Sequence, residues 1–179
     1  MKTYAGKIRQ WAKDRKIIPN STLEAQNLKL AEEFGELADS FRKKDKEVMK
    51  DSVGDIFVVA TILAGLIDKD IEELDILQNK YYENKGNLKY SFMWLQSDIG
   101  DVAKAIVRNK KDKLVSSLGN VVNDLAAFCE WQNINFVNCI VQSWNEIKDR
   151  KGITRKNGIF VKYEDLTEEE KRYIDSLKG

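Results

Sequence analysis

The sequence predicts an all-α protein with a single globular domain, and three observations support that class. The 179 residues include one proline and ten glycines, so few positions interrupt a helix. Apolar residues recur at helical spacing along most of the chain. A hydrophobic content of 42% is sufficient for one real core in a domain of this length.

Two amphipathic helices are expected at the start of the chain, separated by Pro19 and Asn20. Residues 3–15 predict the first. Its inward positions are Ile8, Trp11 and Ala12. Ser21 and Glu24 have the spacing of a capping box, so the second helix is expected to begin there. The apolar stripe of this second helix contains Leu23, Leu30, Phe34, Leu37 and Phe41.

Two further helices are expected before the middle of the chain. The first, at about residues 47–67, is apolar almost all round, which is typical of a helix with neighbours on every side. Its longest apolar run, 56–67, is interrupted by Thr61 and is too short to span a membrane. The second, at about residues 71–84, is expected to end at Lys85-Gly86, a plausible glycine stop.

The pattern then starts again at an offset of 65 residues. Three pairs of segments align: 33–38 with 98–103, 52–56 with 117–121 and, after a one-residue slip, 79–86 with 145–152. Chance alignment of two amphipathic regions is the alternative, but the apolar positions and both glycines of the first two pairs coincide. We therefore predict a tandem duplication of a helical unit, roughly residues 22–87 and 88–152.

The remaining residues, 153–179, depart from this pattern. Asn157-Gly158 lies between two short apolar segments, which predicts a β-hairpin. Thr167 and Glu170 have the spacing of a capping box, so a last short helix is expected at about 168–177.

Charge and cysteine usage limit the classes of function. Charged residues make up 33% of the chain but balance to a net charge of +1, which argues against general nucleic-acid binding. The basic N-terminus is followed by no apolar run, so no signal peptide is expected. Cys129 and Cys139 lie in apolar helical stretches and are expected as small core residues of a reduced protein. We therefore expect a cytoplasmic protein that binds neither membranes nor nucleic acid.

The chemically informative residues are carboxylates on the second and third predicted helices, in a chain that has no histidine. On a helix, Glu33 and Glu36 share a face, and so do Glu32 and Glu36. Asp51 and Asp55 are four residues apart. If the two faces point toward each other, they form an all-oxygen cage that suits Mg²⁺ or Mn²⁺ better than zinc. Mg²⁺ in such cages often completes its coordination with substrate phosphates, which predicts a nucleotide-handling enzyme.

Each carboxylate also has a simpler explanation. Helical glutamates are usually solvated, and Lys29 has the spacing to pair with Glu33. Glu32 is open to three interpretations: a metal ligand, a catalytic base or a solvent-facing residue. Asp55 directly precedes a buried apolar run, where aspartate is rare unless it is paired or binds metal. The predicted metal ligands are Glu33, Glu36, Asp51 and Asp55. The predicted catalytic residues are Glu33, Glu36, Asp55 and Glu32.

The second copy retains only part of this acidic set. The counterparts of the four predicted ligands are Asp98, Asp101, Ser116 and Asn120, in chain order. This copy carries several cations on its last predicted helix, and Arg and Lys can bind phosphate oxygens. Cations are also common in the last turn of a helix for electrostatic reasons, and both explanations stay open. The candidate nucleotide-binding residues are Lys148, Arg150, Asn145 and Lys29.

These residues resemble the MazG-like, all-α nucleoside triphosphate pyrophosphohydrolase superfamily, which also includes dimeric dUTPases and related phage enzymes. Glu33 and Glu36 match its ExxE motif. Its ExxD motif is matched in part, because Asp55 is present but Ser52 occupies the glutamate position, with Asp51 as the stand-in. The phage-type branch is the most similar. Further matching segments are 8–12, 145–152 and 157–162.

The resemblance implies Mg²⁺-dependent conversion of an NTP or dNTP to the monophosphate and pyrophosphate, with Mn²⁺ as a second candidate metal. It also implies a dimeric or tetrameric helical bundle with sites near subunit interfaces. In this chain, we expect the two copies to pack as a pseudo-dimer with one competent metal site, and a dimer of pseudo-dimers is the candidate homo-oligomer.

Two alternatives stay open. A non-catalytic nucleotide sensor or regulatory protein on the same scaffold is favoured by Ser52 and by the incomplete second copy. A plain helical adaptor would bind neither metal nor nucleotide. The sequence indicates no base specificity, because the aromatic residues that could stack on a base are expected in the core or at an interface. These are Trp11, Phe57, Trp94, Trp131 and Trp144.

Overall fold

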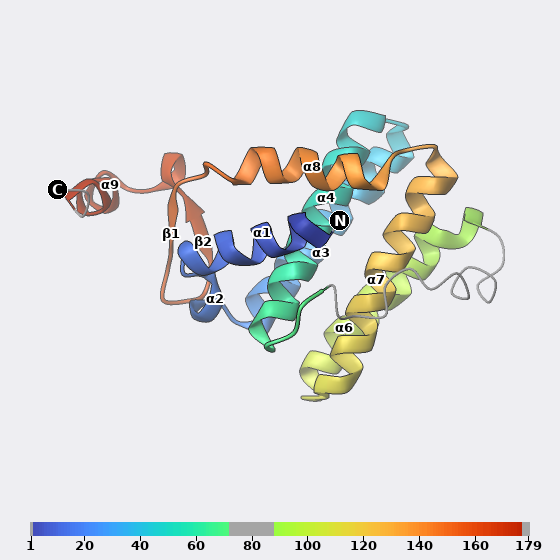
Figure 1. Cartoon of the computed structure of the whole chain (residues 1–179), viewed down its shortest axis with the longest axis horizontal. Coiled ribbons are helices and arrows are strands. Elements are labelled where there is room, and N and C mark those ends of the chain that lie inside the picture. The colour runs from blue at the N-terminus through green and yellow to red at the C-terminus, as the bar shows by residue number, and fades with distance from the viewer. Residues whose placement is uncertain (1, 72–87, 177–179) are drawn as a thin grey trace.

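The computed structural model describes residues 2–71 and 88–176, and in this part of the chain it is helical except for one short hairpin (Figure 1). The helices are α1 (Lys2–Asp14), α2 (Ile17–Asn20), α3 (Leu23–Lys43), α4 (Lys46–Leu66), α6 (Ser91–Val107), α7 (Lys111–Gln132), α8 (Phe136–Ile147) and α9 (Glu168–Ser176). The shorter elements are η1 (Leu88–Tyr90), η2 (Tyr163–Asp165), β1 (Gly152–Thr154) and β2 (Phe160–Lys162). The predicted all-α class is confirmed. The helix predicted at 71–84 and its stop at Lys85-Gly86 fall outside the described residues, apart from Ile71.

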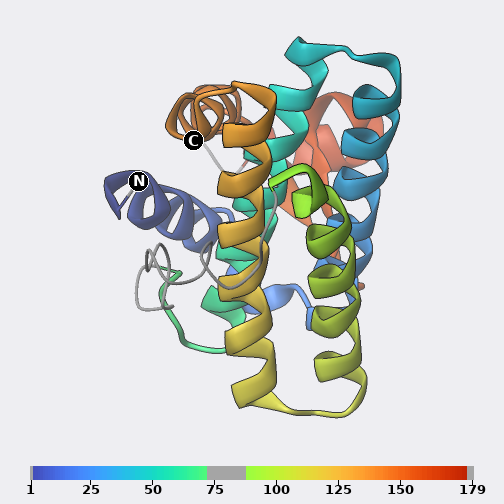
Figure 2. The same ribbon diagram turned by 90° about the vertical axis from the view of Figure 1, so that its right-hand side faces the viewer.

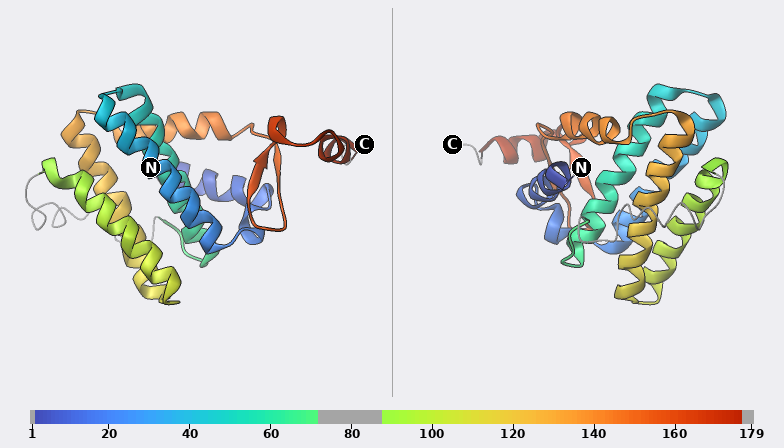
Figure 3. Two further views of the ribbon diagram at one scale, coloured as in Figure 1. Left: turned by 180° about the vertical axis from the view of Figure 1, so that it is seen from behind. Right: turned by 45° about the vertical axis from the view of Figure 1, so that its right-hand side comes forward.

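Four long helices form the body of the molecule. Figure 2 shows α3 and α4 as one antiparallel pair and α6 and α7 as a second pair alongside it. α6 packs on α3, α7 packs on α4, and α8 and α1 cover another side of α4. The hairpin and α9 project from one end, as both views in Figure 3 show. α4 therefore has neighbours on several sides, as its apolar pattern predicts.

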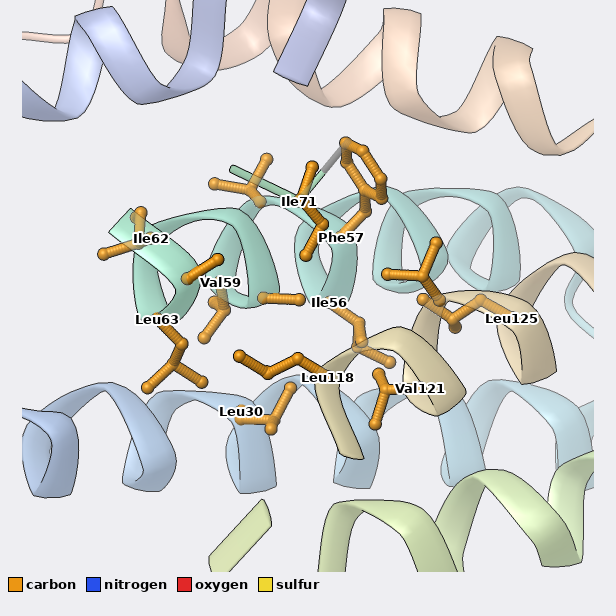
Figure 4. Close-up of a cluster of buried hydrophobic side chains, with 14 of the residues drawn as sticks. Leu30, Ile56, Phe57, Val59, Ile62, Leu63, Ile71, Leu118, Val121 and Leu125 are labelled. Carbon is orange, nitrogen blue, oxygen red and sulfur yellow. The ribbon is translucent and has the colours of Figure 1, made fainter. Parts of the chain in front are cut away.

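The core is centred on α4, where most residues from Met49 to Gly65 are buried. Figure 4 shows Ile56 and Leu63 facing Leu30 of α3 and Leu118 of α7. Cys129 and Cys139 are free thiols, and both are buried as predicted. Among the described residues, no helix is both long and apolar enough to cross a membrane.

The start of α3 differs from the prediction by one residue. The cap is Thr22, whose Oγ1 accepts a hydrogen bond from the Ala25 backbone N at 3.1 Å. The predicted cap, Ser21, is buried and its Oγ accepts from Gln26 Nε2 at 2.9 Å. Ser21 also ends α2, and its Cα lies close to the hairpin residue Gly158. The predicted Ser21–Glu24 capping box is therefore wrong, because packing directs Ser21 inward.

The C-terminal elements agree with their prediction. β1 and β2 pair antiparallel, with Ile153 opposite Val161. Gly158 has a φ of +80°, a conformation that favours glycine, and its N–H donates to the Arg155 carbonyl at 2.9 Å to close the turn. The predicted cap of α9 is confirmed by a reciprocal pair of hydrogen bonds. Glu170 N donates to Thr167 Oγ1 (3.3 Å), and Thr167 N donates to Glu170 Oε2 (2.9 Å).

The two helical pairs have the same backbone turns at the 65-residue offset. Lys44 and Asn109, which follow α3 and α6, have positive φ values of 60° and 49°. Asp68 and Asn133, which follow α4 and α7, have positive φ values of 57° and 54°. Two backbone hydrogen bonds recur at this offset: Asp45 N to Ser40 O (3.0 Å) with Lys110 N to Ala105 O (2.9 Å), and Lys69 N to Ala64 O (2.9 Å) with Ile134 N to Cys129 O (2.8 Å). On this agreement we propose that the pairs derive from a tandem duplication, whose boundaries stay a prediction.

Candidate active site

A cavity of about 410 Å³ lies between the α3–α4 pair and the C-terminal hairpin, and we call it the α3–α4 cavity. Its charged lining includes Lys29 and Glu33 of α3, Asp55 of α4, Arg150 beyond α8, and Lys162 and Asp165 near the hairpin. Its apolar lining includes Trp11, Val58, Val59, Ile62 and Phe160. One cavity therefore combines carboxylates, cations and a large apolar surface, as sites for small polar ligands commonly do.

Close contact between α4 and α8 helps to position Asp55. A side chain at Gly54 would overlap Ser143 Oγ and would lie 2.5 Å from the Cys139 carbonyl oxygen. Glycine therefore lets α8 approach the backbone of α4. This approach places Ser143, which is fully buried, beside Asp55 and directs the end of α8 toward the cavity.

Glu33 is the most buried of the predicted site carboxylates, with 3% of its surface exposed. Lys29 lies one helical turn earlier on the same face, and its Nζ is 2.7 Å from Glu33 Oε1 and 3.0 Å from Glu32 Oε1. Burial raises the pKa of Glu33, although its hydrogen bond to Lys29 opposes the increase. Partial burial would lower the pKa of Lys29, but the hydrogen bonds to Glu33 and Glu32 raise it above its ordinary value. The ion pair thus holds two charged groups at the edge of the cavity.

The pKa of the Asp55 carboxyl group is strongly perturbed. Burial raises its pKa to about 7, and the negative charges of Glu33 and Asp51 add to the increase. Ser143 and Arg150 oppose it. Near neutral pH, this carboxyl group is therefore close to half-protonated, a state that suits a group exchanging protons or awaiting a cation.

The other predicted acids lie around this centre without lining the cavity. Glu36 and Glu32 are exposed, although the charges of both act on Glu33. Asp51 is half-buried and accepts a hydrogen bond from Gln142 Nε2 at 3.5 Å. Across residues 2–71 and 88–176, no three acidic or thiol side chains converge as a preformed metal site. Glu33, one of the predicted ligands, is paired with Lys29 in this structure. The metal-ligand set stays a prediction.

Besides Lys29, Arg150 is the predicted nucleotide-binding residue that lines the cavity. Its carbonyl accepts a hydrogen bond from Arg15 Nε at 2.9 Å, which ties this segment to the N-terminal part of the chain. Lys148 and Arg150 were predicted to lie on the last helix of the second copy, and this prediction is wrong. α8 ends at Ile147, and Lys148 is its C-terminal cap. Asn145 and Lys148 are exposed and are not part of the cavity lining.

Sequence reasoning placed Trp11 in the core and did not assign it to the site. The structure buries it to 7% exposure but also places it in the cavity lining, where its ring meets Phe160 of the hairpin edge-on at 6.0 Å. Its Nε1 is buried without a hydrogen-bond partner among the described residues. The segments around Trp11 and Phe160 both belong to the family-like motifs of the sequence, but their spacing does not show that they meet.

Comparison with known proteins agrees with the acidic motif. Residues 21–78 match the family described as MazG nucleotide pyrophosphohydrolase domain, which agrees with the predicted family resemblance. The chain is also 48% identical over 69 residues to an uncharacterized 18.2 kDa protein from the rep-hol intergenic region of Haemophilus phage HP1 (strain HP1c1). That alignment covers 37% of this chain and 42% of the relative, and its phage source agrees with the predicted phage-type branch. No solved structure matches the chain significantly.

Proposed function

Because residues 21–78 match the MazG nucleotide pyrophosphohydrolase domain family, we propose that this chain hydrolyses nucleoside triphosphates or their deoxy forms to the monophosphate and pyrophosphate. The observation that carries this proposal is the cavity that Asp55 shares with Glu33, Lys29 and Arg150. Nucleotide hydrolysis needs a proton acceptor and groups that neutralise phosphate charge, and these residues supply both.

The two kinds of lining suggest how a nucleotide would bind. The cations Lys29 and Arg150 would contact phosphate oxygens, because guanidinium and ammonium groups form strong charge-assisted hydrogen bonds with them. Trp11 and Phe160 would contact the base, and the unpartnered Trp11 Nε1 would donate to an acceptor on its edge. A volume of about 410 Å³ lies within the range of small-ligand sites.

The donor set fits a hard divalent cation. Glu33, Glu36, Asp51 and Asp55 would hold Mg²⁺ or Mn²⁺ through carboxylate oxygens alone. Burial, followed by the negative charges of Glu33 and Asp51, raises the pKa of Asp55, and this supports the fit because a bound cation would stabilise the charged carboxylate. When bound, the ion would neutralise triphosphate charge and make water a better nucleophile.

The chain's own groups account for the movement of protons and charge. Water adds to phosphorus, the bond between the α- and β-phosphates breaks, and pyrophosphate leaves with the bridging oxygen. The proton lost by water would pass to a carboxylate, for which the candidates are the buried Glu33, the half-buried Asp55 and the exposed Glu32. Arg150 and Lys29 would stabilise the charge on the leaving pyrophosphate.

A non-catalytic nucleotide-binding or regulatory protein is the second candidate. Ser52, which replaces the motif glutamate, is buried and donates its hydroxyl to the Val48 carbonyl at 2.9 Å. It therefore offers no carboxylate in place of the missing one. This observation favours binding without turnover.

A product assay separates the two candidates. Purified chain would be incubated with the common NTPs and dNTPs in Mg²⁺ or Mn²⁺, and monophosphate plus pyrophosphate would be resolved from diphosphate plus phosphate. We expect the former products, with a loss of at least about 100-fold in Asp55→Asn. Asp98→Asn is the matched control, because Asp98 corresponds to Glu33 at the 65-residue offset, and it should retain activity. Nucleotide binding without products would establish the second candidate, and equal damage from both variants would contradict a single competent site.

A further inference from the structure

A second cavity, of about 530 Å³, lies on the other helical pair where α6 turns into α7, and we call it the α6–α7 cavity. Its lining is strongly cationic. The four cations are Lys104, Arg108, Lys110 and Lys113. The single carboxylate in the lining, Asp101, is already paired with Lys104 at 3.3 Å. Neutral hydrogen-bonding groups complete the polar lining, and they belong to Ser116, Ser117 and Asn120.

The charge of this cavity is the reverse of that at the corresponding positions of the first helical pair. Each of the nine lining residues has a counterpart 65 residues earlier. Those counterparts include five carboxylates and one cation, whereas the α6–α7 cavity has one carboxylate and four cations. The carboxylates of the first pair are Glu36, Asp39, Asp45, Asp51 and Asp55. Neutral replacements would be sufficient to remove a metal site, so its loss does not by itself explain the gain of cations.

One of these replacements removes a stabilising interaction. Asp45 caps α4, where its Oδ1 accepts hydrogen bonds from the backbone N of Glu47 and Val48, each at 3.2 Å. Lys110 occupies the same place at the start of α7 and forms no side-chain cap. A lysine cannot accept these bonds, so it weakens the helix start while adding a positive charge to the cavity. Helix stability therefore does not account for this residue.

We propose that the α6–α7 cavity binds a polyphosphate anion, such as pyrophosphate or the phosphate chain of a nucleotide, as a second and non-catalytic site. Four cations around one cavity repel one another, and a bound polyphosphate would neutralise that repulsion over several contacts. Arg108 offers a planar donor fork, and the lysines offer mobile point charges. The cavity has the size of a small-molecule site, and the chain's net charge of +1 gives no extended basic surface for a nucleic acid.

The test is calorimetric titration of the full chain with pyrophosphate in EDTA, so that the α3–α4 cavity lacks the divalent cation proposed to neutralise phosphate charge there. Lys104→Asp/Lys110→Asp restores the residues found 65 positions earlier, which the first helical pair accommodates in the same backbone turns. The matched control, Lys13→Asp/Lys156→Asp, makes the same change in net charge at two exposed positions outside both cavity linings. We expect one pyrophosphate per chain in wild type and control, and binding at least about tenfold weaker in the cavity variant.

Further arms locate the site and identify the ligand. Asp55→Asn should retain binding in EDTA, so failure of the proposed hydrolysis would leave this result unaffected. Titration with ATP in EDTA shows whether the site accepts a nucleoside as well as the phosphates. If the double variant does not fold by circular dichroism, Arg108→Ala provides the same test. Absence of binding, loss of binding in Asp55→Asn, equal loss in the control, or tighter binding of a DNA duplex than of pyrophosphate would each overturn the proposal.

Discussion

Replacing Asp55 with asparagine should stabilise the metal-free protein at pH 8. The folded chain raises the pKa of Asp55 from 3.8 to about 7, first through burial and then through the charges of Glu33 and Asp51. Between pH 4 and pH 7 the folded state therefore binds more protons than the unfolded state, so stability falls as pH rises. The pKa of Asp55 is raised by about three units, and each unit corresponds to about 1.36 kcal/mol, so the charged carboxylate lowers the free energy of unfolding by about 4 kcal/mol. This penalty reaches its full value above pH 7. Asparagine keeps the shape of the side chain and removes this penalty.

The assay is urea denaturation in EDTA at pH 8 and pH 5. The gain in Asp55→Asn should be about 4 kcal/mol at pH 8 and about 1.5 kcal/mol at pH 5, where most of the penalty has been relieved by protonation. Asp39→Asn is the control, because Asp39 is exposed and its hydrogen bonds to Lys43 and Arg42 lower its pKa. That control should gain no stability at either pH. An equal gain from Asp55→Asn at both pH values, or a loss at pH 8, would refute the argument that the buried charge destabilises the fold.

Three other substitutions test the packing and the ion pair. Thr22→Ala should lower the free energy of unfolding by about 1 kcal/mol through loss of the α3 cap, and if Thr22 is not the cap its urea midpoint will not change. Gly54→Ala should destabilise by about 1–3 kcal/mol or more because its methyl group would overlap α8, and an unchanged melting temperature would contradict that close contact. Lys29→Gln should destabilise more at pH 8 than at pH 5, because it leaves a buried Glu33 charge without its partner; urea denaturation at both pH values measures the difference.

Local pattern predicted most of the helices, because amphipathic spacing and capping residues act over a few positions. The near-continuous apolar sequence of α4 correctly predicted its central position. The error at Ser21 shows where this reasoning stops. Ser21 and Thr22 are equally suited to cap a helix, and the choice depends on packing against Gly158, a residue more than a hundred positions away. The extension of α8 to Arg150 failed for a related reason, because cations at a helix end do not mark its last residue.

For the candidate site, the sequence identified the residues whose burial is unusual and missed those that depend on distant contacts. Asp55 was recognisable because a carboxylate directly before a buried apolar run is rare unless it is paired or binds a metal. The pairing of Lys29 with Glu33 was also foreseeable from helical spacing, although its effect on a metal ligand was not. Trp11 could not be assigned to the site, because α1 and the hairpin meet only in three dimensions.

The composition of the α3–α4 cavity separates reaction class from substrate choice. Residues 21–78, which match the MazG nucleotide pyrophosphohydrolase domain, supply Lys29, Glu33 and Asp55. Trp11, Phe160 and Arg150 come from segments outside that match. A family match to the acidic helices therefore predicts the chemistry but carries no information on the surface that would face the base. On the proposed function, chains that share α3 and α4 but differ in α1 and the hairpin should hydrolyse different nucleotides, since the groups that contact the base would change while the carboxylates remain.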